Sequence, residues 1–346
     1  MTCNYYTRLP QIQRFAGNPN TNTTATTTLK PEMKTFYDKT LLDEASPELV
    51  HDQFGQERDI PRGGGKTIEF RKFSALPKAT TPLTEGVTPD GRALTVTEKT
   101  ATVDQYGDYV TLSDVLDMTA IDPVIVEATE LIGQQAGKTL DTVTREKIQG
   151  GTNVMYQPTP SAVGETAVTS RAKLTAKNVL TVKEVFRAAA ALKAANAQKI
   201  DGAYVAIIHP YVAYDLMMEA GDQWLDINKY KNPEKIYNGE IGMLGGVRFV
   251  ETSEAKIWKG TADNCADGVA VFGTLFIGKN AYGKTKLENG GLEVIVKPKG
   301  SAGTADPLNQ RSTVGWKATK TAEILSEEYM IRVESGSSWN DQAEKN

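Results

Sequence analysis

The sequence predicts an α+β fold built around one long helix and one long β-hairpin. Residues 122–149 carry apolar side chains at spacings of three and four, the period of a helix with one buried face. Residues 66–112 contain two strand patterns separated by a segment dense in turn-forming residues. A short apolar run at Tyr204–Ile208 predicts a buried strand. These signals favour a mixed architecture over an all-helical or all-β one.

The composition bounds the class of protein. The chain has 346 residues, of which 40% are hydrophobic and 24% charged, so it can bury a substantial core without disulfides or metals. A formal net charge of -4 argues against a surface that grips nucleic acid over much of its area. No apolar run approaches the roughly 20 residues of a membrane span, and the N-terminus lacks the apolar core of a signal peptide. We therefore expect assembly in the cytoplasm and no membrane contact.

The first 30 residues predict an arm rather than a folded unit. The stretch Asn20–Thr28 is rich in Thr and Asn and holds too little apolar surface to fold alone. Such a segment is either a disordered tail or an arm that becomes ordered on a neighbouring molecule, and we favour the arm. A short helix is expected at Lys30–Asp43, with Met33, Phe36, Tyr37 and Leu41 on one face.

The segment Arg62–Thr67 has the letters of a phosphate-binding loop but not its spacing. That motif needs a glycine five residues before Gly65, where this chain has Ile60. A strand rather than a helix is expected after it. We therefore predict that Gly63, Gly64 and Gly65 act as a hinge between the arm and the hairpin.

The hairpin is expected to need a partner molecule. Its strands are predicted at Thr67–Phe73 and Leu94–Val103, with the turn-rich segment Pro82–Arg92 between them. So long a hairpin with so few large apolar residues cannot bury much against its own domain. Another molecule must therefore cover it.

The long helix begins at a clear signal. Asp122 is a cap and Pro123 suits the first helical position, while Gly150 and Gly151 end the pattern. At 1.5 Å a residue, the helix is expected to be a rod of roughly 40 Å.

The remaining elements are predicted from shorter signals. Thr181 and Glu184 form a capping box, with Leu180 and Val185 placed as a hydrophobic staple, for a helix that runs to about Asn196. The other expected elements are a loop at 150–172, a short helix from Pro210, a glycine-rich turn at Gly239–Gly246, and strands at 247–251, 269–272, 292–296 and within 316–333.

The residues of catalysis are scarce. His51 and His209 are the only histidines; His51 has no apparent partner, and His209 is expected to be a hydrogen-bonded structural imidazole. Cys3 and Cys265 predict two reduced thiols rather than a disulfide or a zinc site. Carboxylate pairs at Glu327–Glu328 and Asp114/Asp117 are more typical of solvated faces or inter-subunit ion pairs. We expect no enzymatic activity, no cofactor and no metal.

Two stretches resemble a known family. The first is Leu83–Gly91, continuing to Gln105–Asp114, with the motifs EGVTPDG and QYGDYV-LSD. The second joins Ile207–Pro210 to Gly242–Gly246 and Val247–Thr252. Both are similar to the N-four-type major capsid proteins of tailed bacteriophages. The order of elements resembles the wider Hong Kong 97-type capsid fold along nearly the whole chain.

The resemblance implies a division into parts. These are an N-terminal arm (1–62), an extended hairpin loop over the neighbouring subunit (63–112), a peripheral domain with a spine helix (113–174), an axial domain (175–274), return strands of the peripheral domain (275–336) and a polar C-terminal tail (337–346).

The resemblance also implies a function. The chain would assemble with itself into the pentamers and hexamers of an icosahedral head around double-stranded DNA. The implied partners are a portal, a separate scaffolding protein, decoration proteins on the outer face, and DNA through weak non-specific contact. The hypothetical contact residues at the hairpin tip are Thr84, Glu85, Gly86, Pro89, Asp90, Gly91 and Arg92.

Two alternatives stay open on the sequence. A cellular, encapsulin-like nanocompartment shell would have the same fold and would hold a cargo enzyme. An oligomeric α+β enzyme belongs to a different class, and the scarcity of histidine argues against it.

Overall fold

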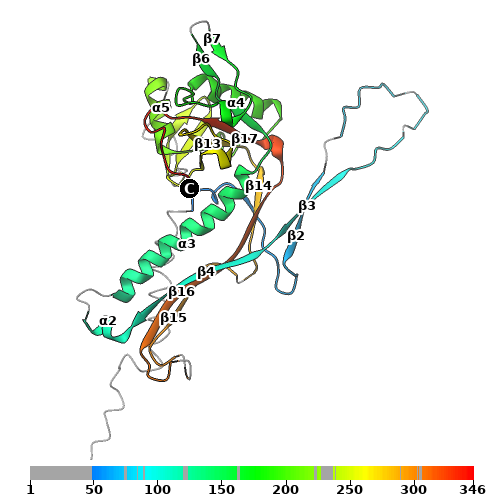
Figure 1. Cartoon of the computed structure of the whole chain (residues 1–346). Coiled ribbons are helices and arrows are strands. Elements are labelled where there is room, and N and C mark those ends of the chain that lie inside the picture. The colour runs from blue at the N-terminus through cyan, green and yellow to red at the C-terminus, as the bar shows by residue number, and fades with distance from the viewer. Residues whose placement is uncertain are drawn as a thin grey trace, which may run out of the picture.

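A computed structural model describes residues 49–346 except 74–75, 84, 89, 120–123, 162–163, 222–223, 227–236, 238, 289, 302 and 304–305. The predicted helix at Lys30–Asp43, the predicted cap at Asp122 and Pro123, and Cys3 lie outside the described residues. A compact α/β part, a long helix with its sheet and a projecting hairpin make up the described chain (Figure 1).

The spine of the molecule is α3 (Val124–Gln149), a helix of 26 residues or about 39 Å, which follows the short helix α2 (Asp114–Thr119). The prediction of a long helix ending before Gly150 is confirmed. Ile132, Ala136 and Leu140 form its buried stripe and lie in one apolar cluster with Trp316 of the sheet beneath. The helix therefore covers one face of that sheet.

That sheet has five strands and is centred on β16, the longest strand among the described residues. Its members are β1 (Gln56–Glu57), β4 (Asp104–Ser113), β14 (Tyr282–Thr285), β15 (Glu293–Lys297) and β16 (Arg311–Ile324). Strand β4 pairs antiparallel with β16, from Asp104 opposite Lys320 to Ser113 opposite Arg311. Alternate residues of β16 are buried beneath the helix, as expected for a sheet covered on one face.

The projecting hairpin is shorter than the sequence suggested. Strands β2 (Thr67–Phe73) and β3 (Val96–Thr102) pair antiparallel along their full length. The chain then continues into β4, which joins the sheet on β16 instead of prolonging the hairpin. Sequence alone could not reveal this, because the partner strand lies about 200 residues away.

The compact part contains an eight-stranded sheet with two helices against it. In spatial order the strands are β5 (Val154–Tyr156), β17 (Met330–Ser335), β13 (Ala270–Ile277), β8 (Tyr204–Ile208), β11 (Val247–Glu251), β10 (Glu240–Leu244) and β9 (Leu225–Asp226), with β12 (Ile257–Lys259) also paired to β13. The helices are α4 (Val182–Ala194) and α5 (Pro210–Ala220). A two-stranded ribbon of β6 (Thr159–Ser161) and β7 (Gly164–Thr166) and the 3₁₀ turns Arg171–Lys173, Thr261–Asp263 and Glu327–Tyr329 complete the chain.

Local sequence explains the two helices. The Thr181 side chain accepts a hydrogen bond from the backbone N–H of Glu184, as the capping box predicted. Leu180 and Val185 are fully buried. Helix α5 begins with Pro210 at its first position, as predicted.

Both faces of the eight-stranded sheet are buried. On one face, helices α4 and α5 pack against Ala206, Ile208 and Phe249. On the other, Val205 and Ile207 share a cluster with residues of the arm, the end of α3 and the five-stranded sheet. The two sheets therefore share one continuous core.

Several predicted boundaries differ from the structure. Residues 150–172, predicted as a loop, hold the short strands β5, β6 and β7, and β10 lies within the predicted turn at Gly239–Gly246. The predicted boundary after residue 274 cuts through β13, and β17 belongs to the eight-stranded sheet rather than to the peripheral return strands. Short strands with few apolar residues carry little periodic signal, which explains these differences.

The polar segment 337–346 is packed against the compact part. The Ser337 hydroxyl is buried and donates to Asp215 of α5 at 2.9 Å. The side-chain amide of Asn346 donates to the carbonyl of Ala255 and accepts from the N–H of Ile257. Polar residues here serve fixed hydrogen bonds, so composition alone did not predict their burial.

Candidate inter-subunit contact surface

The hairpin carries a group of exposed large apolar side chains. Beyond the paired strands, residues 76–94 run far from the rest of the molecule (Figure 1). The exposed large apolar residues of this hairpin are Phe73, Leu76, Leu83, Val87, Leu94 and Val96, with Leu83 77% exposed and Leu94 65%. Several exposed apolar side chains on one projecting element are typical of a surface that binds another molecule.

The tip contains the residues that the sequence analysis singled out. Glu85, Gly86, Asp90, Gly91 and Arg92 are all exposed, whereas Thr84 and Pro89 lie outside the described residues. Gly86 has φ +76°, a conformation that favours glycine. A side chain added at Gly86 or Gly91 would meet nothing within 4 Å in its own molecule.

The glycines before the hairpin make a tight turn. The N–H of Gly64 donates to the carbonyl of Pro61, and Gly63 and Gly65 have φ of 85° and 83°. Strand β2 follows immediately at Thr67. The segment enters a strand, so it lacks the helix N-terminus with which a phosphate loop holds its ligand.

A buried polar cluster anchors the arm to the long helix, and sequence reasoning missed it. The prediction that His51 has no partner is wrong. Nδ1 of His51 lies 2.5 Å from Oδ2 of Asp141, its backbone N–H donates to the same carboxylate at 2.7 Å, and both side chains are fully buried. The hydroxyl of Tyr282 donates to the His51 carbonyl. Ninety residues separate the pair, so no local pattern could have indicated it.

A neighbouring ion pair extends this cluster to the five-stranded sheet. Nζ of Lys320 lies 2.5 Å from Oδ2 of Asp52, and the Thr144 hydroxyl donates to the other oxygen of that carboxylate. Burial lowers the pKa of Lys320, and Asp52 opposes that shift. The cluster therefore joins the arm, the long helix and strand β16.

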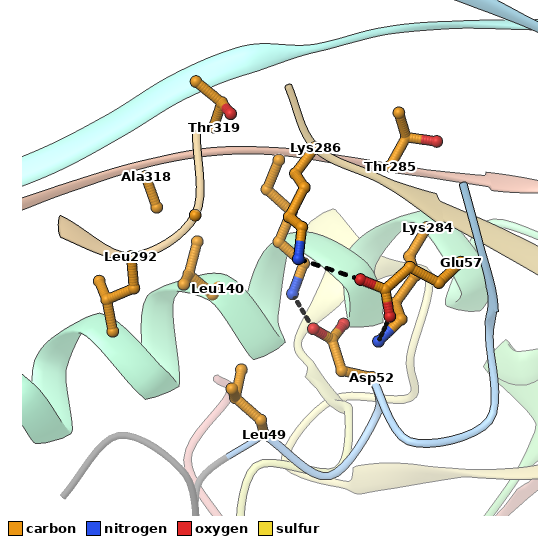
Figure 2. A pocket seen from close by; sticks show the side chains of 12 residues that line it. Leu49, Asp52, Glu57, Leu140, Lys284, Thr285, Lys286, Leu292, Ala318 and Thr319 are labelled. Carbon is orange, nitrogen blue, oxygen red and sulfur yellow. Dashed lines mark hydrogen bonds and ion pairs between the residues drawn. The ribbon is translucent and has the colours of Figure 1, made fainter. Parts of the chain in front are cut away.

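A pocket beside this cluster is lined by paired charges. It has a volume of about 410 Å³ and lies beside Asp52, with Leu140 of the long helix on one wall. Figure 2 shows Lys286 and Lys284 pointing at Glu57. Hydrogen bonds from these two lysines lower the pKa of the Glu57 carboxyl. Such a set of mutual ion pairs fastens segments together and presents no isolated acid or base.

The remaining candidates for chemistry have structural roles. Nδ1 of His209 accepts the N–H of Tyr211, so the imidazole is hydrogen-bonded as predicted, and it also caps helix α5. Burial lowers the pKa of His209 to about 4. Cys265 is buried, and burial raises the pKa of its thiol to about 11. The Glu327 carboxylate accepts the N–H of Thr152.

The described residues contain no group of three or more His, Cys, Asp and Glu side chains arranged to hold a metal ion. None of the described helices combines the length and apolar character that a membrane span requires.

A sequence model of the phage capsid protein family matches residues 112–302, more than half of the chain. The chain belongs to the phage capsid protein family. It is a major capsid protein, a structural component of the virion shell, and this family consists of structural proteins rather than enzymes. No curated protein matches the sequence.

Solved phage capsids share the fold. The capsid protein of Ralstonia phage GP4 is 15% identical, with a TM-score of 0.64 over 84% of this chain and 88% of that chain. The capsid protein of cyanophage P-SCSP1u is 16% identical, with a TM-score of 0.59 over 84% and 89%. That of cyanophage Pam1 is 14% identical, with a TM-score of 0.58 over 98% and 100%. The predicted Hong Kong 97-type α+β fold is confirmed.

Proposed function

We propose that this capsid protein self-assembles into the pentamers and hexamers of an icosahedral head that encloses double-stranded DNA. The observation that carries the proposal is the projecting hairpin, whose apolar side chains its own molecule leaves exposed. Burying Leu83 or Leu94 against another copy would contribute about 1.5–3 kcal/mol for each side chain. The same contact repeated around a closed ring turns a modest local gain into a stable shell.

The parts of the chain take different roles in this proposal. Residues 1–62 are the arm and residues 63–112 contain the loop that covers a neighbouring subunit. The long helix with the five-stranded sheet serves as the peripheral domain, and the eight-stranded sheet with α4 and α5 as the axial domain that meets its copies at the centre of each ring. The hinge at Gly63, Gly64 and Gly65 joins the arm to the hairpin and lets the two change direction relative to each other.

The proposed partners follow from the same assignment. They are further copies of the chain, a portal, a separate scaffolding protein and decoration proteins, with packaged DNA touched weakly and without sequence preference. The net charge of -4 fits a shell that does not bind the negatively charged packaged DNA tightly. Assembly takes place in the cytoplasm of the bacterial host. The family match favours a phage head over a cellular nanocompartment, and nothing in the described residues favours an enzyme.

Substitutions at the hairpin tip that block its proposed contact and leave the chain folded test this proposal. We expect Gly86→Val and Gly91→Val, together, to reduce the yield of particles at least about tenfold, because both positions are proposed to lie against a neighbour. The monomer should still fold, since a side chain at either position meets nothing in its own molecule. Electron microscopy and sedimentation measure particles, and circular dichroism measures folding.

A matched control separates backbone strain from lost contact. Gly202 has φ +91° and open space around it, in an exposed turn of the compact part. Gly202→Val imposes the same kind of backbone strain away from the hairpin, and we expect it to assemble normally. Normal particle yield from the tip variant would refute the proposed role of residues 84–92.

A further inference from the structure

The root of the hairpin is buried at Phe70 of β2 and at Ala101 of β3, and Phe70 is its one buried aromatic side chain among the described residues. Phe70 is 5% exposed, whereas Glu69 is about half exposed and Phe73, three residues on, is 62% exposed. It sits in the middle of β2, opposite Lys99 of β3. Phe70 is thus the one residue of β2 that is buried.

The ring of Phe70 lies in a notch left by a glycine. A Cβ atom at Gly283 would lie 2.9 Å from both Cε1 and Cζ of Phe70, and 3.4 Å from Cδ1 of Leu325. Contacts under 3.0 Å are not tolerated between carbon atoms, so any side chain at position 283 would displace the ring. Gly283 does not have a positive φ. The ring, and not the backbone conformation, therefore requires glycine there.

The strand that carries the notch is fixed on both sides. Gly283 pairs with Glu323 of β16 and with Gln56 of β1. Phe70 lies within β2 (Thr67–Phe73), between the turn at Gly63–Gly65 that precedes the strand and the hairpin tip that follows it. A second contact, between Nζ of Lys72 and the ring of Tyr329 at 4.9 Å, is exposed and correspondingly weak.

We propose that Phe70 is the positioning residue of the hairpin: its ring, seated over Gly283, sets the direction in which the tip is presented to a neighbouring subunit. The inference rests on the proposed contact of the tip with another copy. Because the tip lies far from the notch, a small rotation at Phe70 moves residues 84–92 by a much larger distance. Seating the ring preorganises the contact before the neighbour arrives.

The direction of the hairpin can be measured in the unassembled chain. With Cys3 and Cys265 replaced by serine, spin labels at Val87→Cys on the tip and Lys138→Cys on the long helix, both exposed positions, report the distance between tip and body. We expect a narrow distance distribution in the parent and a distribution at least about twice as broad in Phe70→Ala. Phe73→Ala is the matched control, because its ring is exposed, and it should leave the distribution narrow.

Substitutions on both sides of the contact, at Gly283 and at Phe70, test whether the ring needs the space that the glycine leaves. Gly283→Ala should broaden the same distribution, because the new Cβ expels the ring. Adding Phe70→Leu should narrow it again, since leucine lacks the Cε1 and Cζ atoms that collide. We expect the variants with a broad distance distribution to assemble less well. Phe70→Ala and Gly283→Ala should each raise the protein concentration needed for assembly about tenfold, and the double variant Gly283→Ala with Phe70→Leu should recover part of this loss.

The outcomes separate the two proposals. A narrow distribution in Phe70→Ala, or a broad one that leaves assembly unchanged, would overturn the positioning role. Failure of the Gly86 and Gly91 substitutions to impair assembly would overturn the tip contact, while the distance distribution would still report whether Phe70 holds the hairpin. Far-ultraviolet circular dichroism of each variant confirms that the body has folded.

Discussion

At the scale of single residues, His209 links the stability of the compact part to pH. Its imidazole is 7% exposed, caps helix α5 and contacts the rings of Tyr211 and Phe272. Burial disfavours the charged form, which lowers the pKa from 6.5 to about 4. The unfolded chain therefore binds this proton at a higher pH than the folded chain does. The neutral imidazole is the form that the fold accepts.

The sign of the pH effect follows directly. Above pH 6.5 the imidazole is neutral in both the folded and the unfolded chain, so it does not change the free energy of unfolding. As the pH falls from about 6.5 to about 4, protonation of the unfolded chain lowers the free energy of unfolding by up to about 3 kcal/mol. His209→Asn keeps a capping side chain without this titration. We expect its free energy of unfolding, measured by denaturant titration, to fall less than that of the parent across this window. Parallel pH curves for the two proteins would contradict the assignment.

Contacts between residues far apart in the sequence were the least predictable part of the candidate surface. The capping role of His209 follows from its place before Pro210, which is a local signal. The pairing of His51 with Asp141 is long-range, and a buried polar contact of that kind leaves no mark on either segment. The tip residues were found because glycine, proline and aspartate cluster there, a pattern that indicates an exposed turn but not what the turn touches.

At the scale of elements, local capping decides where helix α4 begins. The Thr181 hydroxyl accepts the N–H of Glu184, and the helix buries Ala188, Ala189 and Leu192 against the sheet. Thr181→Ala removes the cap, and we expect it to lower the free energy of unfolding by about 1 kcal/mol. Thr181→Ser keeps the oxygen and serves as the control. Equal stability of the two variants would show that the cap contributes nothing.

Elements with a strong period were predictable, and elements defined by pairing were not. Helix α3 and strand β8 have enough regular apolar residues to be recognised alone. Strand β10 contains Gly242 and ends at the Gly245–Gly246 turn, so its sequence indicates a turn although it pairs with β11 and β9. Strand β4 pairs with β16 and not within the hairpin, a choice that depends on residues far along the chain.

At the scale of the whole molecule, a shared core makes the two sheets one folding unit. Val50 and Phe54 of the arm, Ile148 of the long helix and Ile207 of the eight-stranded sheet belong to one buried cluster. The polar cluster of His51, Asp141, Asp52 and Lys320 lies at the same junction. Because these two clusters join the arm, the long helix and both sheets, we expect the two sheets to unfold together.

The junction can be weakened at one buried charge. Lys320 is 7% exposed and its ammonium is paired with Asp52, so Lys320→Ala leaves a largely buried carboxylate without its cation. Breaking such a pair costs about 3–5 kcal/mol. We expect a single calorimetric transition in the parent. In Lys320→Ala we expect a transition that begins at a lower temperature and separates into two, because the five-stranded sheet unfolds first.

Lys317→Ala is the matched control on the same strand. Its ion pair with Glu293 is exposed on both sides, and losing it should lower the free energy of unfolding by less than about 1 kcal/mol. If both variants unfolded like the parent, the junction would contribute nothing to the coupling of the two sheets.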